Sequence, residues 1–222
     1  MSGRAVLGFS FTTVRGDPLR IMCLGAHADD IEIGCGGTVL RLLSEHPDAS
    51  VRWVVFSGDG VRKSEAEDAA NRFLGGCRDR AVEVHGFRDG YFPDQQAAIK
   101  DVFERLKREH QPSLILTHFR EDAHQDHRVI CELTWNTFRD HLIWEYEIPK
   151  YEGDQGNPNL FVPLSKEIAC RKTAAIVEGF PSQLMRPWFS AETFMALMRL
   201  RAIACRAPEG FAEAFYCRKV VV

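Results

Sequence analysis

Short apolar runs alternate with segments of helical periodicity along this chain, and no other feature restricts the fold as strongly. The runs IMCLG at 21–25 and VRWVVFS at 51–57 have the length and the β-branched and aromatic content of buried strands. Apolar residues at helical spacing follow them at 31–43 and at 65–74. Such repeated strand–helix units predict a parallel sheet with helices on both faces, because each helix returns the chain for the next strand.

The alternation continues through the rest of the chain. Further strands are expected at 81–85, 114–117 and 142–148, and further helices at 95–109 and 124–138. Beyond a polar loop at 151–159, the expected elements are helices at 166–178 and 191–203 and a closing strand at 215–222. We therefore predict one three-layer, Rossmann-like α/β domain with a mainly parallel sheet over residues 1–222. Its core is expected at about 19–148 and a C-terminal extension at about 149–222.

Composition excludes several classes of protein. The net charge of −3 and the scattered basic residues argue against a nucleic-acid partner. No apolar run approaches the ~20 residues of a membrane helix, and residues 1–20 lack the pattern of a signal peptide. Seven cysteines without a Cys-x-x-Cys pair suit a reducing compartment. We expect a cytoplasmic protein with a small-molecule partner and without membrane insertion, and the sequence leaves open whether it forms a homo-oligomer.

Two segments rich in histidine and aspartate follow predicted strands. HADD at 27–30 comes directly after the first strand, and DAHQDH at 122–127 comes shortly after the fourth. Open α/β sheets bind their ligands beyond the carboxyl ends of the strands, and parallel strands place these ends on one rim. We therefore expect the two segments to form one site, although they lie far apart in the sequence.

The residue types in these segments suit a catalytic zinc. Such a zinc takes three protein ligands from His and Asp or Glu, and a water with a pKa lowered toward ~7 fills the fourth position. A free carboxylate can then accept the proton of that water. The two segments contain three histidines and four aspartates, which is enough for both tasks. Taken singly, Asp29 and Asp30 could be a helix N-cap pair, and His124 and His127 two surface residues on one helix face, but the placement of both segments at matching strand ends favours the metal site.

Other features carry weaker signals. Gly34-Cys35-Gly36-Gly37 lies inside the first helical pattern, behind two carboxylates that would repel a phosphate, so we expect it to allow close packing of the helix on the sheet. His118 is near enough to the second segment to support it, and Arg62 and Arg120 could contact a polar substrate or stay solvated. The remaining histidines, expected to be structural or solvated, are His46, His85, His110 and His141.

Together the two segments resemble the motifs of the LmbE-like, or PIG-L, deacetylase family. AHADDIEIGCGGT at 26–38 is similar to the family's first motif, Ala-His-Pro-Asp-Asp-x-Glu-x-Gly-x-Gly-Gly-Thr, and DAHQDH contains the His-x-Asp-His core of the second. The likeness extends over roughly 19–138. Ala28 replaces the usual proline, which loosens the turn slightly but removes no ligand. The tail from Tyr146 onward matches no subfamily of known substrate.

The resemblance implies an LmbE-like fold and the hydrolysis of N-acetyl groups on glucosamine-containing substrates. The metal ligands that it implies are His27, Asp30 and His127. It makes Asp29 the general base and His124 the acid and oxyanion stabiliser, with Asp126 orienting and tuning His124. The implied metal is Zn²⁺, and the same ligand set also accepts iron(II).

We therefore predict a zinc-dependent N-deacetylase that acts on a small amino-sugar conjugate, and two alternatives stay open. An iron(II) enzyme with two histidines and one carboxylate could use His27, Asp29 and His127, although such sites are usual in all-β barrels. A non-catalytic sugar-binding module would be expected to lack a ligand or the base. The loop at 151–159 should emerge on the same rim, where it would either recognise the sugar or serve as a solvated connector.

Overall fold

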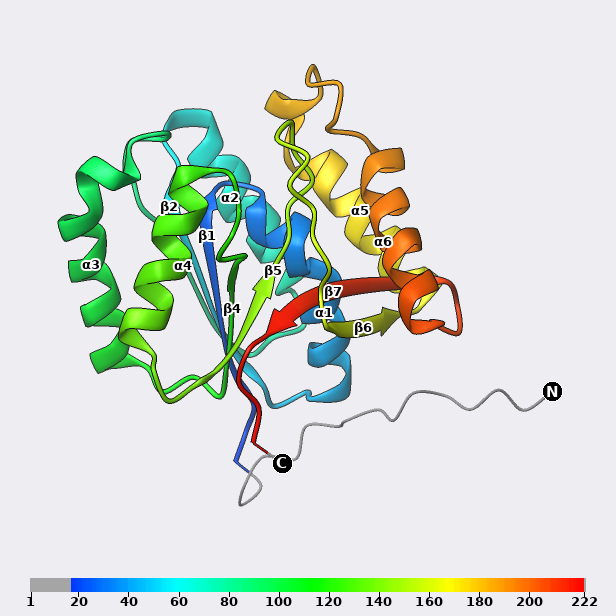
Figure 1. Cartoon of the computed structure of the whole chain (residues 1–222), viewed down its shortest axis with the longest axis horizontal. Coiled ribbons are helices and arrows are strands. Elements are labelled where there is room, and N and C mark those ends of the chain that lie inside the picture. The colour runs from blue at the N-terminus through cyan, green and yellow to red at the C-terminus, as the bar shows by residue number, and fades with distance from the viewer. Residues whose placement is uncertain (1–16, 222) are drawn as a thin grey trace.

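Seven strands form one sheet in the computed structural model, which describes residues 17–221 (Figure 1). They are β1 (Arg20–His27), β2 (Ser50–Ser57), β3 (Asp79–Val84), β4 (Leu114–His118), β5 (Leu142–Tyr146), β6 (Leu160–Leu164) and β7 (Phe211–Cys217). The order across the sheet is β3-β2-β1-β4-β5-β7-β6. The first five strands are parallel to one another, and β7 is antiparallel to β5 and to β6. This confirms the mainly parallel sheet that the strand–helix alternation predicts.

Helices cover both faces of the sheet and complete the three layers. They are α1 (Asp30–Glu45), α2 (Gly60–Phe73), α3 (Phe92–Glu109), α4 (Gln125–Thr137), α5 (Lys166–Gly179), the 3-10 helix η2 (Pro181–Gln183) and α6 (Ala191–Cys205). α3 and α4 pack together on one face, whereas α1, α2 and α5 pack together on the other, with α6 against α5 and β7 (Figure 1). No helix in this part of the chain combines the length and hydrophobicity needed to cross a bilayer.

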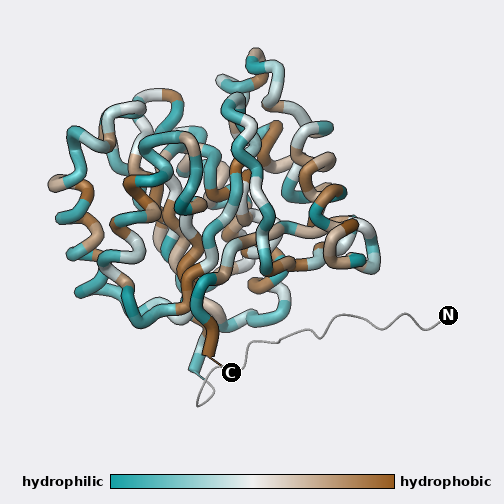
Figure 2. Tube along the Cα trace, in the orientation of Figure 1, coloured by the Kyte–Doolittle hydropathy of each residue, from teal (hydrophilic) through white to brown (hydrophobic). Residues whose placement is uncertain are grey.

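Two apolar clusters lie on the two faces of the sheet, and β1 contributes to both. Ile21 and Cys23 belong to the cluster under α1, α2 and α5, whereas Met22 and Leu24 belong to the cluster under α3 and α4. A strand buried on both sides must be apolar at every position, which explains the continuous run IMCLG. Figure 2 shows the hydrophobic segments concentrated along the central strands and the hydrophilic ones at the periphery.

The last part of the sheet differs from the sequence prediction. The closing strand predicted at 215–222 is wrong in its bounds, since β7 runs from Phe211 to Cys217, and residue 222 lies outside the described part. Residues 211–215 of β7 are all buried, because β7 lies between β5 and β6 inside the sheet. Strand β6 was not predicted at all, and its Pro163 is unusual in a strand but is tolerated at the sheet edge that β6 occupies.

The predicted role of the glycines in α1 is confirmed. A Cβ atom at Gly34 would overlap the ring of Tyr146 on β5, and one at Gly37 would lie 2.6 Å from Leu164 Cδ1 on β6. On the other side of α1, a Cβ at Gly36 would lie 2.5 Å from Phe73 Cε1. Glycine at these positions therefore lets α1 approach β5, β6 and α2 closely.

We expect Gly34→Ala to lower the free energy of unfolding by about 1–3 kcal/mol, the usual cost of overpacking a core. The added methyl group must displace Tyr146, which is fully buried and donates a hydrogen bond from its hydroxyl to the carbonyl of Leu24 at 2.7 Å. Urea denaturation measures the difference. Gly76→Ala is the matched control, because nothing lies within 4 Å of a Cβ at that position. Equal stability of the two variants would contradict the packing argument.

Two strands at the centre of the sheet define where a ligand can bind. β1 and β4 are adjacent, and the chain leaves them in opposite directions, through α1 to β2 and through α4 to β5. This arrangement is a topological switch point, and in open α/β sheets the crevice beyond its carboxyl ends receives the ligand. The segments 27–30 and 122–127 both begin at this crevice.

Candidate metal centre

The first segment forms the junction between β1 and α1. His27 is the last residue of β1, and Asp30 opens α1, where a carboxylate is favoured by the helix dipole. Asp30 Oδ2 also accepts a hydrogen bond from the backbone N–H of His27 at 2.6 Å, which closes the turn between them. Asp30 is only 3% exposed, so its carboxylate faces the interior of the site and not the solvent.

The second segment forms the start of α4. His124 is the N-cap residue, and its Nδ1 accepts from the backbone N–H of Asp126 at 3.3 Å. His127 lies in the first turn and is 3% exposed. Asp122 Oδ1 accepts from the backbone N–H of His124 at 2.8 Å, and Asp122 Oδ2 lies 2.9 Å from His127 Nδ1, so Asp122 contacts both histidines of the segment.

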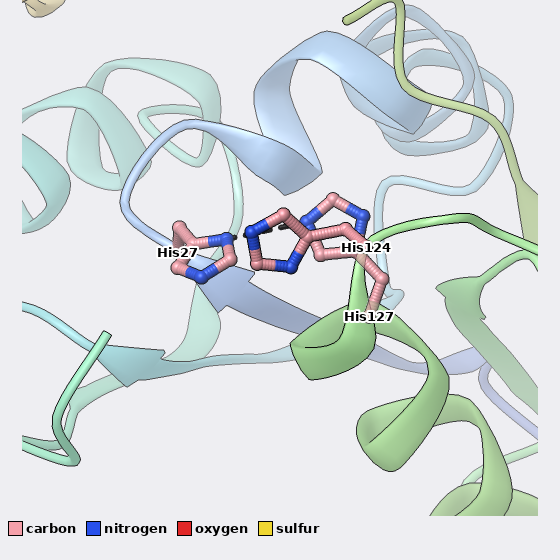
Figure 3. Close-up of side chains that lie close together, drawn as sticks. All are labelled: His27, His124 and His127. Carbon is pink, nitrogen blue, oxygen red and sulfur yellow. Dashed lines mark hydrogen bonds between the residues drawn. The ribbon is translucent and has the colours of Figure 1, made fainter. Parts of the chain in front are cut away.

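Atoms of His27, Asp30 and His127 converge across the switch point. His27 Nδ1 lies 3.2 Å from His127 Nε2, and the Asp30 carboxylate oxygens lie 3.4 Å from the former nitrogen and 3.5 Å from the latter. Figure 3 shows the rings of His27, His124 and His127 facing one another, from the end of β1 and the start of α4. Tetrahedral ligands at the zinc–nitrogen distance of about 2.1 Å are roughly 3.4 Å apart, so this spacing fits a metal ion.

The outer contacts of the two rings show which nitrogens carry lone pairs. His127 Nδ1 lies 2.9 Å from Asp122 Oδ2, and His27 Nε2 lies 3.2 Å from Asp126 Oδ2. A carboxylate accepts only from an N–H, so in neutral rings the opposite nitrogens bear lone pairs and face each other. Carboxylates that orient metal-binding histidines in this way are common in zinc sites. Two lone pairs and the Asp30 carboxylate therefore meet at one point, which calls for a cation.

The pKa values of these three groups also favour a positive charge at the point where they meet. Burial acts to lower the pKa of His27, but Asp30 and Asp126 outweigh it and raise that pKa well above its usual value. Burial, with the neighbouring His118, lowers the pKa of His127 to about 4. Burial opposes ionisation of Asp30, yet the surrounding histidines hold the pKa of that carboxyl well below its usual range. Without a metal, the cluster would thus hold a proton on His27.

Three overlapping groups in the described part of the chain have ligand atoms close enough for a metal ion. They are His27, His124 and His127; Asp30, His118 and His127; and His27, Asp89 and Asp126. The sequence-predicted set of His27, Asp30 and His127 spans the first two groups. His118 Nε2 already accepts from the backbone N–H of Ala26 at 2.9 Å, which occupies its lone pair. The ring of His118 instead stacks on His127 at 3.9 Å and supports it, as the sequence position of His118 suggested.

Asp29 lies beside the ligand cluster and has a separate environment. Its Oδ2 accepts a hydrogen bond from Arg62 Nη2 at 2.9 Å, and the residue is 7% exposed. Burial, with the charge of Asp30, raises the pKa of Asp29 to about 6 against the opposing effect of Arg62. A carboxylate with this pKa can accept a proton near neutral pH, as a general base must.

Asp126 contacts residues other than the one that the family resemblance implies. Its carboxylate accepts hydrogen bonds from the backbone N–H groups of Gly90 at 2.6 Å and Phe92 at 3.1 Å, and it lies next to the ring of His27. Only the backbone N–H of Asp126 is bonded to the His124 ring. The structure thus attaches Asp126 to His27 more directly than to His124.

The two arginines singled out in the sequence have different positions. Arg62 lies at the site and also forms an ion pair with Glu65 at 3.0 Å. Arg120 lies over the ring of Trp135 at 4.9 Å and faces Glu145.

One residue of the site, Asp89, was not predicted from the sequence. Its Oδ1 lies 3.1 Å from His27 Nε2, and a single aspartate in the loop after β3 carries no signal of its own.

The chain is similar to known proteins both in sequence and in fold. The family model described as PIG-L, GlcNAc-PI de-N-acetylase, matches residues 22–138, which include both segments. A conserved protein of Thermus thermophilus has a similar structure, with a TM-score of 0.72 and 22% identity over 92% of this chain and 96% of that one. N,N'-diacetylchitobiose deacetylase from Pyrococcus horikoshii has a TM-score of 0.67 and 20% identity over 90% of this chain and 83% of that one.

A third similar structure belongs to an enzyme with a different activity. GalB, the 4-carboxy-2-hydroxymuconate hydratase of Pseudomonas putida, has a TM-score of 0.68 and 17% identity over 92% of this chain and 98% of that one. At these identities the similarity shows a shared fold, and one fold can carry several chemistries.

Proposed function

The chain belongs to the PIG-L family, and from this premise we propose that it is a metal-dependent N-deacetylase acting on an amino-sugar conjugate. The observation that carries the proposal is the convergence of His27 Nδ1, His127 Nε2 and the Asp30 carboxylate beside a buried carboxylate, Asp29, with a pKa of about 6. The similar structure of N,N'-diacetylchitobiose deacetylase supports this choice of substrate class. Since a hydratase shares the fold, the proposal rests on the family match and the site, and not on the architecture.

We propose His27, Asp30 and His127 as the ligands and Zn²⁺ as the metal, with iron(II) as the second candidate. When bound, such an ion polarises a carbonyl group and lowers the pKa of a water molecule. The neighbouring carboxylates prepare the ligands, because Asp122 and Asp126 keep the lone pairs of the two rings directed at the ion.

The protein groups next to the ligands suit the proton transfers of amide hydrolysis. Asp29 would accept the proton of the attacking water. His124 Nδ1 is occupied by the backbone N–H of Asp126, so Nε2 carries the proton of the neutral ring and can donate to a developing oxyanion. Burial and the nearby His27 lower the pKa of His124, which favours this neutral form. We therefore propose that Asp29, and not His124, returns a proton to the leaving amine.

Dialysis against a chelator is expected to abolish acetate release from N-acetylated amino sugars, and added Zn²⁺ is expected to restore it.

Replacement of any one ligand should weaken Zn²⁺ binding more than about 100-fold, in His27→Ala, Asp30→Ala or His127→Ala. Loss of a residue that only supports a ligand weakens binding by about 10–100-fold. Competition with a chromophoric chelator measures the affinity directly. His110→Ala at the end of α3 serves as the control. Full activity after chelation would refute the proposal, and unchanged affinity in one variant would remove that residue from the ligand set.

A further inference from the structure

Lys150 lies between two carboxylates at the edge of the candidate metal centre. Its Nζ donates to Asp154 Oδ1 at 2.6 Å and to Asp122 Oδ2 at 3.0 Å, and the side chain is only 10% exposed. Asp154 in turn accepts from the backbone N–H of Ala123 at 2.6 Å. The loop between β5 and β6, for which the sequence left open sugar recognition or a solvated connector, is therefore attached to the second histidine segment.

Asp122 connects this ammonium group to both histidines of the segment. Its Oδ2, which accepts from Lys150, also lies 2.9 Å from His127 Nδ1, and its Oδ1 accepts from the backbone N–H of His124. Asp122 is 1% exposed. A continuous chain of contacts therefore runs from Lys150 through one buried carboxylate to a ring of the candidate metal centre.

We propose that Lys150 is a positioning residue of the metal centre, which fixes Asp122 and through it the ring of His127. The inference rests on the proposed function, because it takes His127 as a metal ligand. Asp122 and Asp154 both accept from the ammonium group of Lys150, and the two carboxylates repel each other when this shared cation is removed. Asp122 would then move away from His127, and the lone pair of His127 would lose its fixed direction.

The segment after β5 thus takes part in the metal centre, although Lys150 and Asp154 lie outside the residues 22–138 that match the family model. A purely structural role for Lys150, as an anchor of the loop alone, predicts a loss of stability without any specific effect on the metal. The two roles differ in whether Lys150 acts through Asp122.

The test measures Zn²⁺ affinity of the full chain by competition with a chromophoric chelator. We expect Lys150→Met to weaken Zn²⁺ binding about tenfold, within the range known for residues that support metal ligands. Lys150→Arg keeps the charge and should stay within about threefold of the wild type. Lys107→Met, at an exposed position near the end of α3, is the matched control and should bind as the wild type does.

A double-mutant cycle separates the two roles. If Lys150 acts through Asp122, Lys150→Met should have no further effect on Zn²⁺ affinity in an Asp122→Asn background. An equal effect in both backgrounds, or wild-type affinity in Lys150→Met, would overturn the inference while leaving the proposed function intact. Failure of the wild-type chain to bind Zn²⁺ or iron(II) would overturn both. Circular dichroism of each metal-free variant shows that it is folded before its affinity is compared.

Discussion

Asp29→Asn is expected to lower kcat by about 10²–10⁴-fold while leaving Zn²⁺ affinity close to that of the wild type. The Asp29 carboxylate is bound by Arg62 and is not one of the three converging ligand groups, so the amide should disturb the metal little. An amide cannot accept the proton of the attacking water, and the substitution should therefore lower kcat and not metal affinity. Acetate release and chelator competition, measured on the same preparation, separate the two effects.

Asp30→Asn is the matched control for Asp29→Asn, because it changes the adjacent carboxylate to the same amide. Asp30 lies within 3.5 Å of both ligand nitrogens, so Asp30→Asn should weaken metal binding, whereas Asp29→Asn should not. If Asp29→Asn kept the wild-type rate, or if it lost the metal as Asp30→Asn does, Asp29 would not be the base.

The pH dependence of kcat/KM gives a second check on Asp29. Burial raises the pKa of Asp29 to about 6, and a bound dication would lower that pKa again. Because only the ionised form accepts a proton, activity should fall as the pH decreases through this pKa, at or below about pH 6. The residual activity of Asp29→Asn should lack this acidic limb.

The members of the candidate metal centre could be predicted because strand direction brings them together. β1 and β4 are recognisable as short apolar runs, and residues that follow neighbouring parallel strands must meet at the same rim. No side-chain detail is needed to place His27 near His127, and their ring nitrogens lie 3.2 Å apart. The family resemblance then distinguished Asp29 from Asp30, which spacing alone could not do.

The contacts within the centre could not be predicted, because they depend on side-chain torsions and on loops from other strands. The carboxylate of Asp126 is bound by backbone N–H groups of Gly90 and Phe92, which come from the loop after β3 and the start of α3. Lys150 reaches Asp122 from the loop after β5. Gly90 and Phe92 contribute only backbone N–H groups, and Lys150 is a single polar side chain in a loop, so no periodicity or motif marks these partners in the sequence.

A fully buried ion pair on α5 and β7 binds the C-terminal segment to α1. Lys172 on α5 and Glu213 on β7 are 2.6 Å apart and are 2% and 4% exposed. Glu213 also accepts from the backbone N–H groups of Gly37 at 2.8 Å and Thr38 at 2.6 Å, and Lys172 donates to the carbonyl of Ile33 at 2.6 Å. The pair is therefore bonded to the backbone of the helix that begins with Asp30.

Lys172→Met is expected to lower the free energy of unfolding by about 3–5 kcal/mol, the usual cost of leaving a buried charge without its partner. The substitution also removes the donor that Lys172 gives to the carbonyl of Ile33. Urea denaturation followed by circular dichroism measures the change. Arg72→Met is the matched control, because Arg72 forms an exposed ion pair with Glu178 on α5 at 3.3 Å, and exposed pairs contribute about 0–1 kcal/mol.

The double variant Lys172→Met/Glu213→Gln tests whether the unpaired charge causes the loss. Its neutral side chain at 213 keeps an acceptor for one of the N–H groups of α1, and no buried charge remains. At least half of the lost stability should therefore return, since replacing both partners of a buried pair is often close to neutral. If Lys172→Met were as stable as Arg72→Met, or if the double variant recovered nothing, the buried pair would not be what holds β7 and α5 to α1.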